Sequence, residues 1–388
     1  MAIIDCRNFN GYKPCGKSDI CDDLCPSMNI PSTRILLIHL GALGAVLRST
    51  ALLPAIRRKF PNCHITWVTS KPADQLLKNN SMIDRIFTTD NSDLLSLSAL
   101  EFDIALCVDK SLEAAGVLKR TYADFIYGFA VMPTTGAIVP ATPAAEELWE
   151  IGLNDYKKFK ENQKTETQLV TEALELPYKR DGYSVNFTEA EKADLAIRKA
   201  AFSAGGKIVV GLNTGCAGVI PYKKLTVETH RKLIARLLEN ENVSVVLLGG
   251  KEDADRNEQI GEGFDVIQSA THNGLRDGLV SVAACDVVVT GDSLGMHMAI
   301  ALNKWTVAWF GPTCSQEIDL YDRGVKILSQ VSCGPCWKRS CNKTQMCYDM
   351  VSLEQLEEAV MHGCHVVAFE NERGSVENTD GESFEADV

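Results

Sequence analysis

The sequence predicts an α/β protein made of two doubly wound domains. Apolar, strand-like runs alternate with helical patterns along both halves of the chain, which is typical of parallel sheets covered by helices. The segment Val287–Gly311 contains the repeating unit in its plainest form: a valine run, a polar turn, an apolar helix and a second strand. The chain has 388 residues, which is enough for two domains with full hydrophobic cores.

The composition excludes several classes of protein. Hydrophobic residues make up 45% and charged residues 23%, as in globular proteins, and no apolar run is long enough for a membrane-spanning helix. Asp5 and Arg7 interrupt the first residues, so we expect no signal peptide and a cytoplasmic location, at most peripheral at the inner face of the membrane. The net charge of −12 argues against nucleic acid as a partner. Acidic residues crowd the tail 371–388, which we expect to be disordered.

Eight of the fourteen cysteines form two groups. The first group lies in residues 1–30, a segment with little regular pattern, and has the spacing C-x8-C-x5-C-x3-C. In the absence of a secretory signal, such groups favour metal binding over disulfides, so we expect a structural zinc or iron site on an N-terminal arm. The alternative is a set of reduced thiols on a mobile arm. The candidate ligands are Cys6, Cys15, Cys21 and Cys25.

Residues 31–190 are predicted to form the first domain. A strand is expected at Arg34–Leu40, followed by a tight glycine turn and a helical pattern at Ala45–Phe60. Pro54 falls inside that pattern and predicts a kink or a late helix start. The second strand is expected at His64–Thr69.

Another strand of this domain, Phe102–Val108, ends in Asp109 and Lys110. Because open α/β sheets bind ligands at the carboxyl ends of their strands, Asp109 is a candidate catalytic or substrate-contacting residue. The alternative is a solvated carboxylate paired with Lys110.

The linker is expected at about 180–206, and the second domain at 205–330. The domain opens with the strand Lys207–Leu212, after which a small polar turn and two lysines suit a diphosphate: backbone N–H groups for the oxygens and ammonium groups for the charge. The alternative is a pair of ordinary solvated lysines. The residues concerned are Asn213, Thr214, Gly215, Lys223 and Lys224.

Two later turns of this domain carry further polar residues. Glu252 and Asp253 follow the predicted strand Val243–Leu248. In the segment Val287–Gly311, Asp292 or Ser293 is placed to cap the helix, whose first N–H groups suit an anion. The alternative for that segment is a buried strand–helix turn with a capping aspartate.

The second cysteine group, in residues 331–350, has the spacing C-x2-C-x4-C-x5-C. This spacing is compact enough to surround one tetrahedral zinc or iron ion, or to hold an iron–sulfur centre. The alternative is a redox dithiol, because the first two cysteines form a Cys-Gly-Pro-Cys sequence. A final helix is expected at 351–370. The candidate ligands are Cys333, Cys336, Cys341 and Cys347.

The run GDSLGMHMAIAL, followed by a strand and Phe310-Gly311-Pro312-Thr313, resembles the signature segment of the ADP-heptose:lipopolysaccharide heptosyltransferases, glycosyltransferase family 9. The resemblance implies the GT-B fold, in which two Rossmann-like domains face each other across a cleft. In that family a D-[ST]-[GL]-x-x-H run contacts the nucleotide sugar. The matching residues here are Asp292, Ser293, Leu294, Gly295 and His297.

The stretch LGALGAVLRSTALLPAIRRKFP resembles the first strand–helix turn of the family, which makes Gly41 and Gly44 site residues. The family has Gly-Asp where this chain has Gly44 and Ala45, and that Asp is its proposed general base. Ala45 has no titratable group and cannot take a proton. Three explanations stay open: an engineered replacement of Asp, a base supplied by another side chain such as Asp109, or sugar-nucleotide binding without transfer.

The resemblance also implies roles in the second domain. The turn Asn213–Gly215 and Lys223, with Lys224 as its neighbour, match the diphosphate-binding turn and lysine of the family. Glu252 or Asp253 matches the acidic residue placed against the nucleotide ribose. Some members, of the autotransporter-modifying branch, carry a comparable cysteine-rich finger that is described as iron-binding.

We therefore expect an inverting glycosyltransferase of lipopolysaccharide biosynthesis type. It would transfer heptose or a related sugar from an ADP-heptose-like donor to a glycan or a protein acceptor, without a metal at the diphosphate. Ala45 supports a second hypothesis, a non-catalytic sugar-nucleotide-binding or assembly protein. A third hypothesis is a thiol redox protein built on Cys333 and Cys336.

Overall fold

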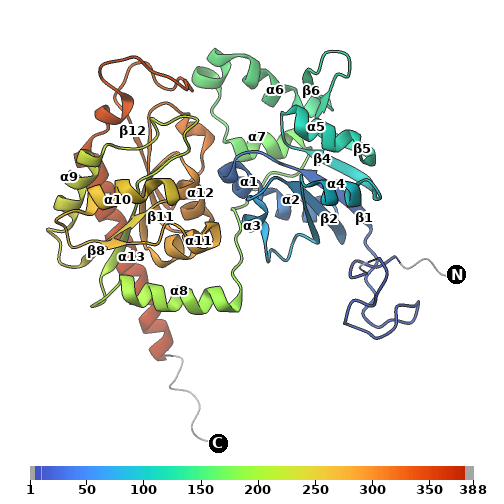
Figure 1. Cartoon of the computed structure of the whole chain (residues 1–388), viewed down its shortest axis with the longest axis horizontal. Coiled ribbons are helices and arrows are strands. Elements are labelled where there is room, and N and C mark those ends of the chain that lie inside the picture. Colours follow the sequence, from blue (N-terminus) through green and yellow to red (C-terminus); the bar gives the residue numbers. More distant parts are fainter. Residues whose placement is uncertain (1–4, 10, 381–388) are drawn as a thin grey trace, which may run out of the picture. The chain divides into compact units, whose positions relative to one another are not determined.

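The computed structural model describes residues 5–9 and 11–380, with side chains described as far as residue 373 (Figure 1). The chain divides into two compact units, residues 1–186 and 187–388. The division falls inside the interval 180–206 that we expected to be a linker. The helix α8 (Glu189–Phe202) nevertheless belongs to the second unit, because it packs against α11 (Leu275–Ala284) of that unit.

The first unit contains a six-stranded sheet in the order β3-β2-β1-β4-β5-β6. All neighbouring strands are parallel except the β5–β6 pair. This is the strand order of a Rossmann-like sheet, which reverses its winding between β1 and β4. The strands are β1 (Thr33–Ile38), β2 (Cys63–Thr69), β3 (Arg85–Thr88), β4 (Glu101–Cys107), β5 (Tyr122–Val131) and β6 (Ile138–Pro140).

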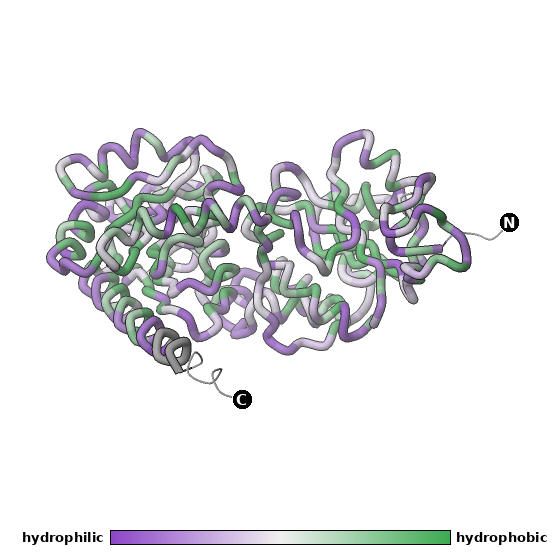
Figure 2. Tube along the Cα trace, turned by 90° about the horizontal axis from the view of Figure 1, so that it is seen from below, coloured by the Kyte–Doolittle hydropathy of each residue, from purple (hydrophilic) through white to green (hydrophobic). Residues whose placement is uncertain are grey.

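The central strand β1 is buried on both faces, as its unbroken apolar run predicts. Ile35 and Leu37 belong to one hydrophobic cluster, whereas Leu36 and Ile38 belong to the cluster on the opposite face. Figure 2 shows hydrophobic segments running through the inside of each unit and hydrophilic segments around the outer helices and loops.

The helical pattern predicted at Ala45–Phe60 is divided into two helices, α1 (Leu43–Ser49) and α2 (Leu52–Lys59). The break lies just before Pro54, as expected from that residue. A proline ring clashes with the carbonyl group four residues earlier, which here belongs to Thr50. The unit also contains α3 (Asp74–Leu77), α4 (Asn91–Leu97), α5 (Leu112–Lys119), α6 (Glu146–Leu153), α7 (Glu166–Ala173), the 3-10 turn Pro143–Ala145 and the π-helical turn Lys157–Glu161.

The second unit contains another six-stranded sheet, in the order β12-β11-β10-β7-β8-β9, with every pair parallel. Counted from its own first strand, this is the order of the first unit, so the winding reverses between β7 and β10. The strands are β7 (Ile208–Asn213), β8 (Val243–Leu248), β9 (Ile267–Gln268), β10 (Val287–Gly291), β11 (Trp305–Phe310) and β12 (Gly324–Leu328).

The last helix, α13 (Leu353–Asp380), contacts β7, β10, β11 and β12 and closes one face of the second sheet. It continues past residue 370, where we expected it to end. Leu356, Val360 and Val367 join the hydrophobic cluster of the unit, and Glu370 forms an ion pair with Arg323, so the helix is stabilised well into its second half. Residues 381–388 of the predicted tail lie outside the described residues.

The other helices of this unit connect its strands along the chain. They are α9 (Val227–Leu237), α10 (Ala254–Gly261) and α12 (Leu294–Ala301), with 3-10 turns at Lys251–Asp253, Ser315–Glu317 and Cys347–Met350. Thr226 caps α9 by accepting a hydrogen bond from the Thr229 N–H group. Across the described residues, none of the helices is both long enough and apolar enough to cross a membrane.

Candidate active site

A cavity of about 190 Å³ lies in the first unit where the sheet reverses its winding, beyond the carboxyl ends of β1 and β4. This is where doubly wound sheets bind ligands. Gly41 and Ala45 line the cavity. Gly44 is buried as the second residue of α1, so the helix begins two residues earlier than the sequence indicates.

Asp109, which follows β4, also lines this cavity. Its Oδ2 atom accepts hydrogen bonds from the backbone N–H groups of Leu40 and Gly41, the latter at 2.8 Å. The carboxylate therefore braces the turn after β1 as well as facing the cavity. The sequence placed Asp109 at a strand end, but this bond to a turn 69 residues away is a product of the sheet.

Ala45 is half-buried and contributes only a methyl group to the cavity. The polar residues around it include four that sequence reasoning missed: His39, Arg48, Ser49 and Glu166. His39 had a visible signal, since it is the one polar side chain near the end of the apolar run RILLIHL. Glu166 had none, because it comes from α7, far along the chain.

His39 is buried, and its Nδ1 atom lies 2.7 Å from Ser49 Oγ. Burial lowers the pKa of His39 to about 4, so the ring is neutral at pH 7. Arg48 Nη2 lies 2.7 Å from Glu166 Oε2. Burial by itself raises the pKa of Glu166, but the Arg48 guanidinium brings it below its usual value, so this pair is charged.

The second unit gathers its predicted site residues at the corresponding place, beyond the carboxyl ends of β7 and β10. Asn213, the last residue of β7, donates through Nδ2 to Ser293 Oγ at 2.9 Å, to Thr290 Oγ1 at 3.2 Å and to the Gly215 carbonyl at 3.1 Å. These bonds join the turn after β7 to the turn after β10. A side-chain carbon at Gly295 would overlap the Asn213 amide, so this position requires glycine.

Ser293 occupies the N-cap position of α12, but its side chain makes no capping hydrogen bond. The capping role expected for it is therefore wrong. The Ser293 hydroxyl instead accepts from Asn213, and Asp292, the other expected cap, forms an ion pair with Lys223 across 3.6 Å. Leu294 begins α12 and is half-buried, and His297 is buried one turn later in that helix.

Lys223 comes from the long loop between β7 and α9, whose backbone packs against the end of β10. A side chain at Gly291 would overlap the Lys223 carbonyl, so glycine permits this close approach. Lys224, next to it, is half-buried. Burial raises the pKa of Asp253 and the charge of Lys224 opposes that shift, which places Lys224 near the Asp253 carboxyl.

The structure separates the roles of the two acidic residues after β8. Asp253 is buried, accepts a hydrogen bond from the Gly250 N–H group at 2.9 Å, and leaves no room for a side chain at Gly215. Glu252 is exposed. Thr214 is buried, and its hydroxyl donates a hydrogen bond to Asn257 Oδ1, which holds the turn after β7 in place.

The second cysteine group lies against the same turns. The Cys341 N–H group donates to Tyr222 Oη at 3.0 Å, and the Cys336 N–H group donates to the Pro312 carbonyl at 3.0 Å. Burial raises the pKa of Cys347 to about 11, and the neighbouring Cys336 and Cys341 thiols add to that shift. A thioredoxin-like dithiol needs its first cysteine at the start of a helix. Residues 331–346 contain no helix, so the Cys333–Cys336 pair lacks that structural basis.

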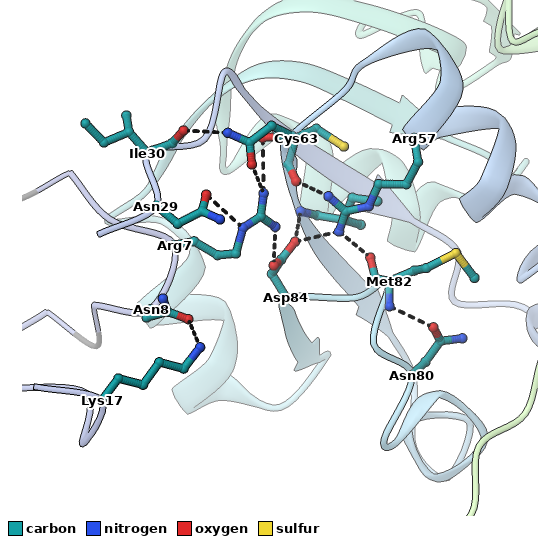
Figure 3. Close-up of polar contacts among 12 residues, drawn as sticks. Arg7, Asn8, Lys17, Asn29, Ile30, Arg57, Cys63, Asn80, Met82 and Asp84 are labelled. Atoms are coloured by element: carbon teal, nitrogen blue, oxygen red, sulfur yellow. Dashed lines mark hydrogen bonds and ion pairs between the residues drawn. The ribbon is translucent and has the colours of Figure 1, made fainter. Parts of the chain in front are cut away.

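The first cysteine group converges on one small cavity of about 20 Å³, lined by all four cysteines together with Phe9 and Met28. The Asn29 N–H group donates to Cys6 Sγ at 3.4 Å. Arg7 connects the arm to the body of the unit through an ion pair with Asp84, which also accepts from Arg57 at 3.0 Å (Figure 3).

In the described ranges, no group of three or more His, Cys, Asp or Glu side chains is gathered tightly enough to hold a metal ion. The cysteines of each group therefore lie in one short stretch of chain, but their side chains do not yet form a metal-coordinating set. All fourteen cysteines are free thiols here.

Comparison with known proteins decides the family. The model of glycosyltransferase family 9 (heptosyltransferase) matches residues 95–347, which include the whole site of the second unit. The chain belongs to glycosyltransferase family 9. The expected resemblance is thereby confirmed, and the protein is a glycosyltransferase enzyme by descent.

Heptosyltransferases are its curated relatives. The chain is 24% identical over 303 residues to lipooligosaccharide heptosyltransferase 2 of Haemophilus influenzae, covering 73% of this chain and 84% of that protein. It is also 33% identical over 90 residues to lipopolysaccharide heptosyltransferase 2 of Escherichia coli, covering 22% of this chain and 26% of that protein.

Solved structures of family 9 share the fold. A glycosyltransferase of this family from Veillonella parvula superposes with a TM-score of 0.69 at 18% identity, covering 87% of this chain and 98% of that one. The iron-containing dodecameric glycosyltransferase TibC of E. coli superposes with a TM-score of 0.53 at 11% identity, covering 87% and 77%. The predicted fold of two Rossmann-like units, as in GT-B heptosyltransferases, is confirmed.

Proposed function

We propose that this protein transfers heptose, or a related sugar, from an ADP-heptose-like donor to a glycan or protein acceptor with inversion at the anomeric carbon. The observation that carries the proposal is the cluster of Asn213, Lys223, Asp292 and Ser293 at the reversal point of the second sheet. Nucleotide-heptose donors are the substrates of the family to which the chain belongs.

In the proposed reaction the second unit holds the donor. The Lys223 ammonium group and the N–H groups of the turn after β7 stabilise the negative charge that develops on the leaving diphosphate. Asp292 holds Lys223 in place before the donor binds, and Asp292 and His297 orient the sugar. Glu252, being exposed beside the turn after β8, is better placed than Asp253 to accept from the ribose hydroxyls.

The first unit holds the acceptor in the cavity beside Ala45 and Asp109. A second candidate function, donor binding without transfer, is favoured by one specific observation: the methyl group of Ala45 stands where the family has its proposed base. The cavity nevertheless contains other proton acceptors, which supports retained chemistry.

Metal binding by the two cysteine groups is a further part of the proposal. Four thiols around one cavity of about 20 Å³ leave room for one water-sized sphere, and zinc or iron would draw the thiolates together. The N–H group that points at Cys6 Sγ suits a metal-bound thiolate. The family relative TibC is an iron-containing glycosyltransferase, which supports iron as one candidate for Cys333, Cys336, Cys341 and Cys347. The metal would be structural.

The decisive experiment measures ADP-heptose binding by calorimetry and ADP release with a core-truncated lipooligosaccharide as acceptor. We expect donor binding and acceptor-dependent ADP release by the unaltered chain. Binding with no release, together with release by Ala45→Asp, would favour the binding-only function. Failure of both forms to bind ADP-heptose would contradict the proposed donor. A cytoplasmic location also stays a prediction, which cell fractionation would test.

A further inference from the structure

The cavity of the first unit brings two proton acceptors to one point. A side-chain carbon at Gly41 would lie 3.1 Å from His39 Nε2 and 3.5 Å from Asp109 Oδ1. Gly41 has no such carbon, so no side chain at this position separates the two atoms from the cavity that His39, Asp109 and Ala45 line together. An acceptor hydroxyl bound in this cavity would therefore meet both side chains as candidate proton acceptors.

The two proton acceptors differ in how many hydrogen bonds they already make. Asp109 Oδ2 already accepts two backbone N–H groups, so this oxygen is engaged in holding the turn after β1. The imidazole of His39 makes its hydrogen bond through Nδ1, to Ser49 Oγ at 2.7 Å. When Nδ1 carries the proton and donates it to Ser49, the lone pair of Nε2 faces the cavity.

The surroundings of His39 suit an imidazole that is neutral before the reaction and carries a positive charge only during proton transfer. Burial opposes the charged imidazolium, as do Arg48 and Lys110, whereas Asp109 and Glu166 favour it. Burial is the largest of these influences, and together they lower the pKa of His39 to about 4. The imidazole is therefore neutral at pH 7 and able to accept a proton.

We propose that His39 is the general base of the transfer, with Ser49 and Asp109 as positioning residues; this inference rests on the proposed function. His39 Nε2 takes the proton of the acceptor hydroxyl as its oxygen forms the bond to the anomeric carbon of the sugar. The bond from that carbon to the diphosphate oxygen breaks, and the nucleoside diphosphate leaves with the electron pair. The imidazolium then returns its proton to water.

The test is chemical rescue of His39→Ala. We expect this variant to lose about 10²–10⁴-fold in kcat for ADP release from ADP-heptose and the truncated acceptor, the usual contribution of a general base. Its affinity for ADP-heptose should be unchanged, because the donor site lies in the other unit. Added imidazole should restore part of the rate in proportion to its concentration.

The pH dependence separates a base from a merely structural residue. The rescued rate should rise with pH through about 6.5, the ordinary pKa of an imidazole ring, because only the neutral form accepts a proton. The double variant with His39→Ala and Ala45→Asp should also regain activity, since it returns a carboxylate to the same cavity.

His64→Asn is the matched control. His64 lies in β2 of the same unit, burial likewise lowers its pKa to about 4, and it does not line the cavity. We expect its kcat to stay within about twofold of the unaltered chain, well below the loss that a missing general base causes.

The outcomes distinguish this inference from the function on which it rests. If the unaltered chain releases no ADP from ADP-heptose, the proposed function and the role of His39 fail together. If that chain is active and His39→Ala keeps its rate, or loses it without any rescue by imidazole or by Ala45→Asp, only the role of His39 is overturned. In that case loss of activity in Asp109→Asn would transfer the role to Asp109.

Discussion

At the scale of single residues, the proposed donor site contains one lysine that an ion pair already holds in place. Lys223 Nζ lies 3.6 Å from Asp292 Oδ2, and both side chains are mostly buried, at 17% and 13% exposure. An ammonium group that is already oriented loses little conformational freedom when it meets a diphosphate. The charge of the neighbouring Lys224 opposes the rise that burial causes in the pKa of Asp253.

We predict that Lys223→Ala weakens ADP binding by about 10–100-fold, which corresponds to a charged hydrogen bond of about 1.5–3 kcal/mol. Calorimetric titration with ADP measures this effect. The matched control is Lys232→Ala, an exposed lysine of α9 paired with Glu228, which should bind ADP as the unaltered chain does. Equal affinities of Lys223→Ala and Lys232→Ala would exclude Lys223 from the diphosphate site.

At the scale of elements, α8 is attached to the second unit by charged contacts with α11. Arg276 forms an ion pair with Glu191 at 2.6 Å, and Arg198 forms one with Asp277 at 2.7 Å. Glu191 also completes the capping box of α8 with Thr188. These contacts explain why a helix that the sequence left in the linker belongs to a folded unit.

We predict that Glu191→Gln lowers the free energy of unfolding by about 1 kcal/mol at pH 7. Glutamine retains the capping hydrogen bond, so the variant removes only the charge. The Arg276 side chain lowers the pKa of Glu191 to about 2, below its value in the unfolded chain. The stabilisation is therefore fully present above about pH 4.5 and disappears as the pH falls towards 2.

Urea unfolding of Glu191→Gln and the unaltered chain between pH 7 and pH 3 measures that difference. Glu189→Gln is the control, since this neighbour on α8 is 89% exposed and its removal should change stability by less than about 0.5 kcal/mol. A difference between Glu191→Gln and the unaltered chain that grew as the pH fell would contradict the assignment.

The N-terminal arm is attached to the first unit in a similar way, through Arg7 and Asp84 (Figure 3). Asp84 remains bonded to Arg57 and to the Ile65 N–H group when Arg7 is absent. We therefore predict that Arg7→Ala loosens the arm but leaves the core stable. Trypsin should cleave after Lys17 several-fold faster, whereas the thermal midpoint should change little. Unchanged cleavage would contradict a role for the Arg7–Asp84 pair in holding the arm.

At the scale of the whole molecule, the two units repeat one plan. Both sheets have the same strand order, and both candidate sites lie where the winding reverses, at β1 and β4 in one unit and at β7 and β10 in the other. The carboxyl ends of the two strands diverge there, so that loops from both can surround a ligand. A cysteine group accompanies each unit.

We predict that the full chain, purified without chelator, contains one zinc or iron ion for each of the two cysteine groups. Elemental analysis measures the content. Cys21→Ser should remove the ion of the first group and Cys336→Ser that of the second, whereas Cys285→Ser, at a buried thiol outside both groups, should remove neither. Because the second group contacts Tyr222, next to Lys223, loss of its ion should also weaken ADP binding. A metal-free chain with full ADP affinity would contradict the prediction.

The sequence alone predicted whatever depends on neighbours along the chain. Buried runs such as Arg34–Leu40 and Val287–Val289 were recognisable as strands, because a strand covered on both faces is apolar throughout. Pro54 predicted the helix break, and the GDS run predicted the turn between β10 and α12. The strands β5 and β6 were not predicted, because β5 exposes Tyr122 and Phe125 and its apolar and polar residues do not alternate clearly.

Only the tertiary structure decided which distant residues share a site. The fold brings Glu166 to Arg48, Asp109 to the turn after β1, and Asn213 to Ser293. It also turned the expected helix cap at Ser293 into a partner of Asn213. Pattern and propensity report local conformation, whereas these contacts are set by the order in which the strands assemble. The sequence determined the family and the positions of the strands, and the packed sheets decided which side chains surround Ala45.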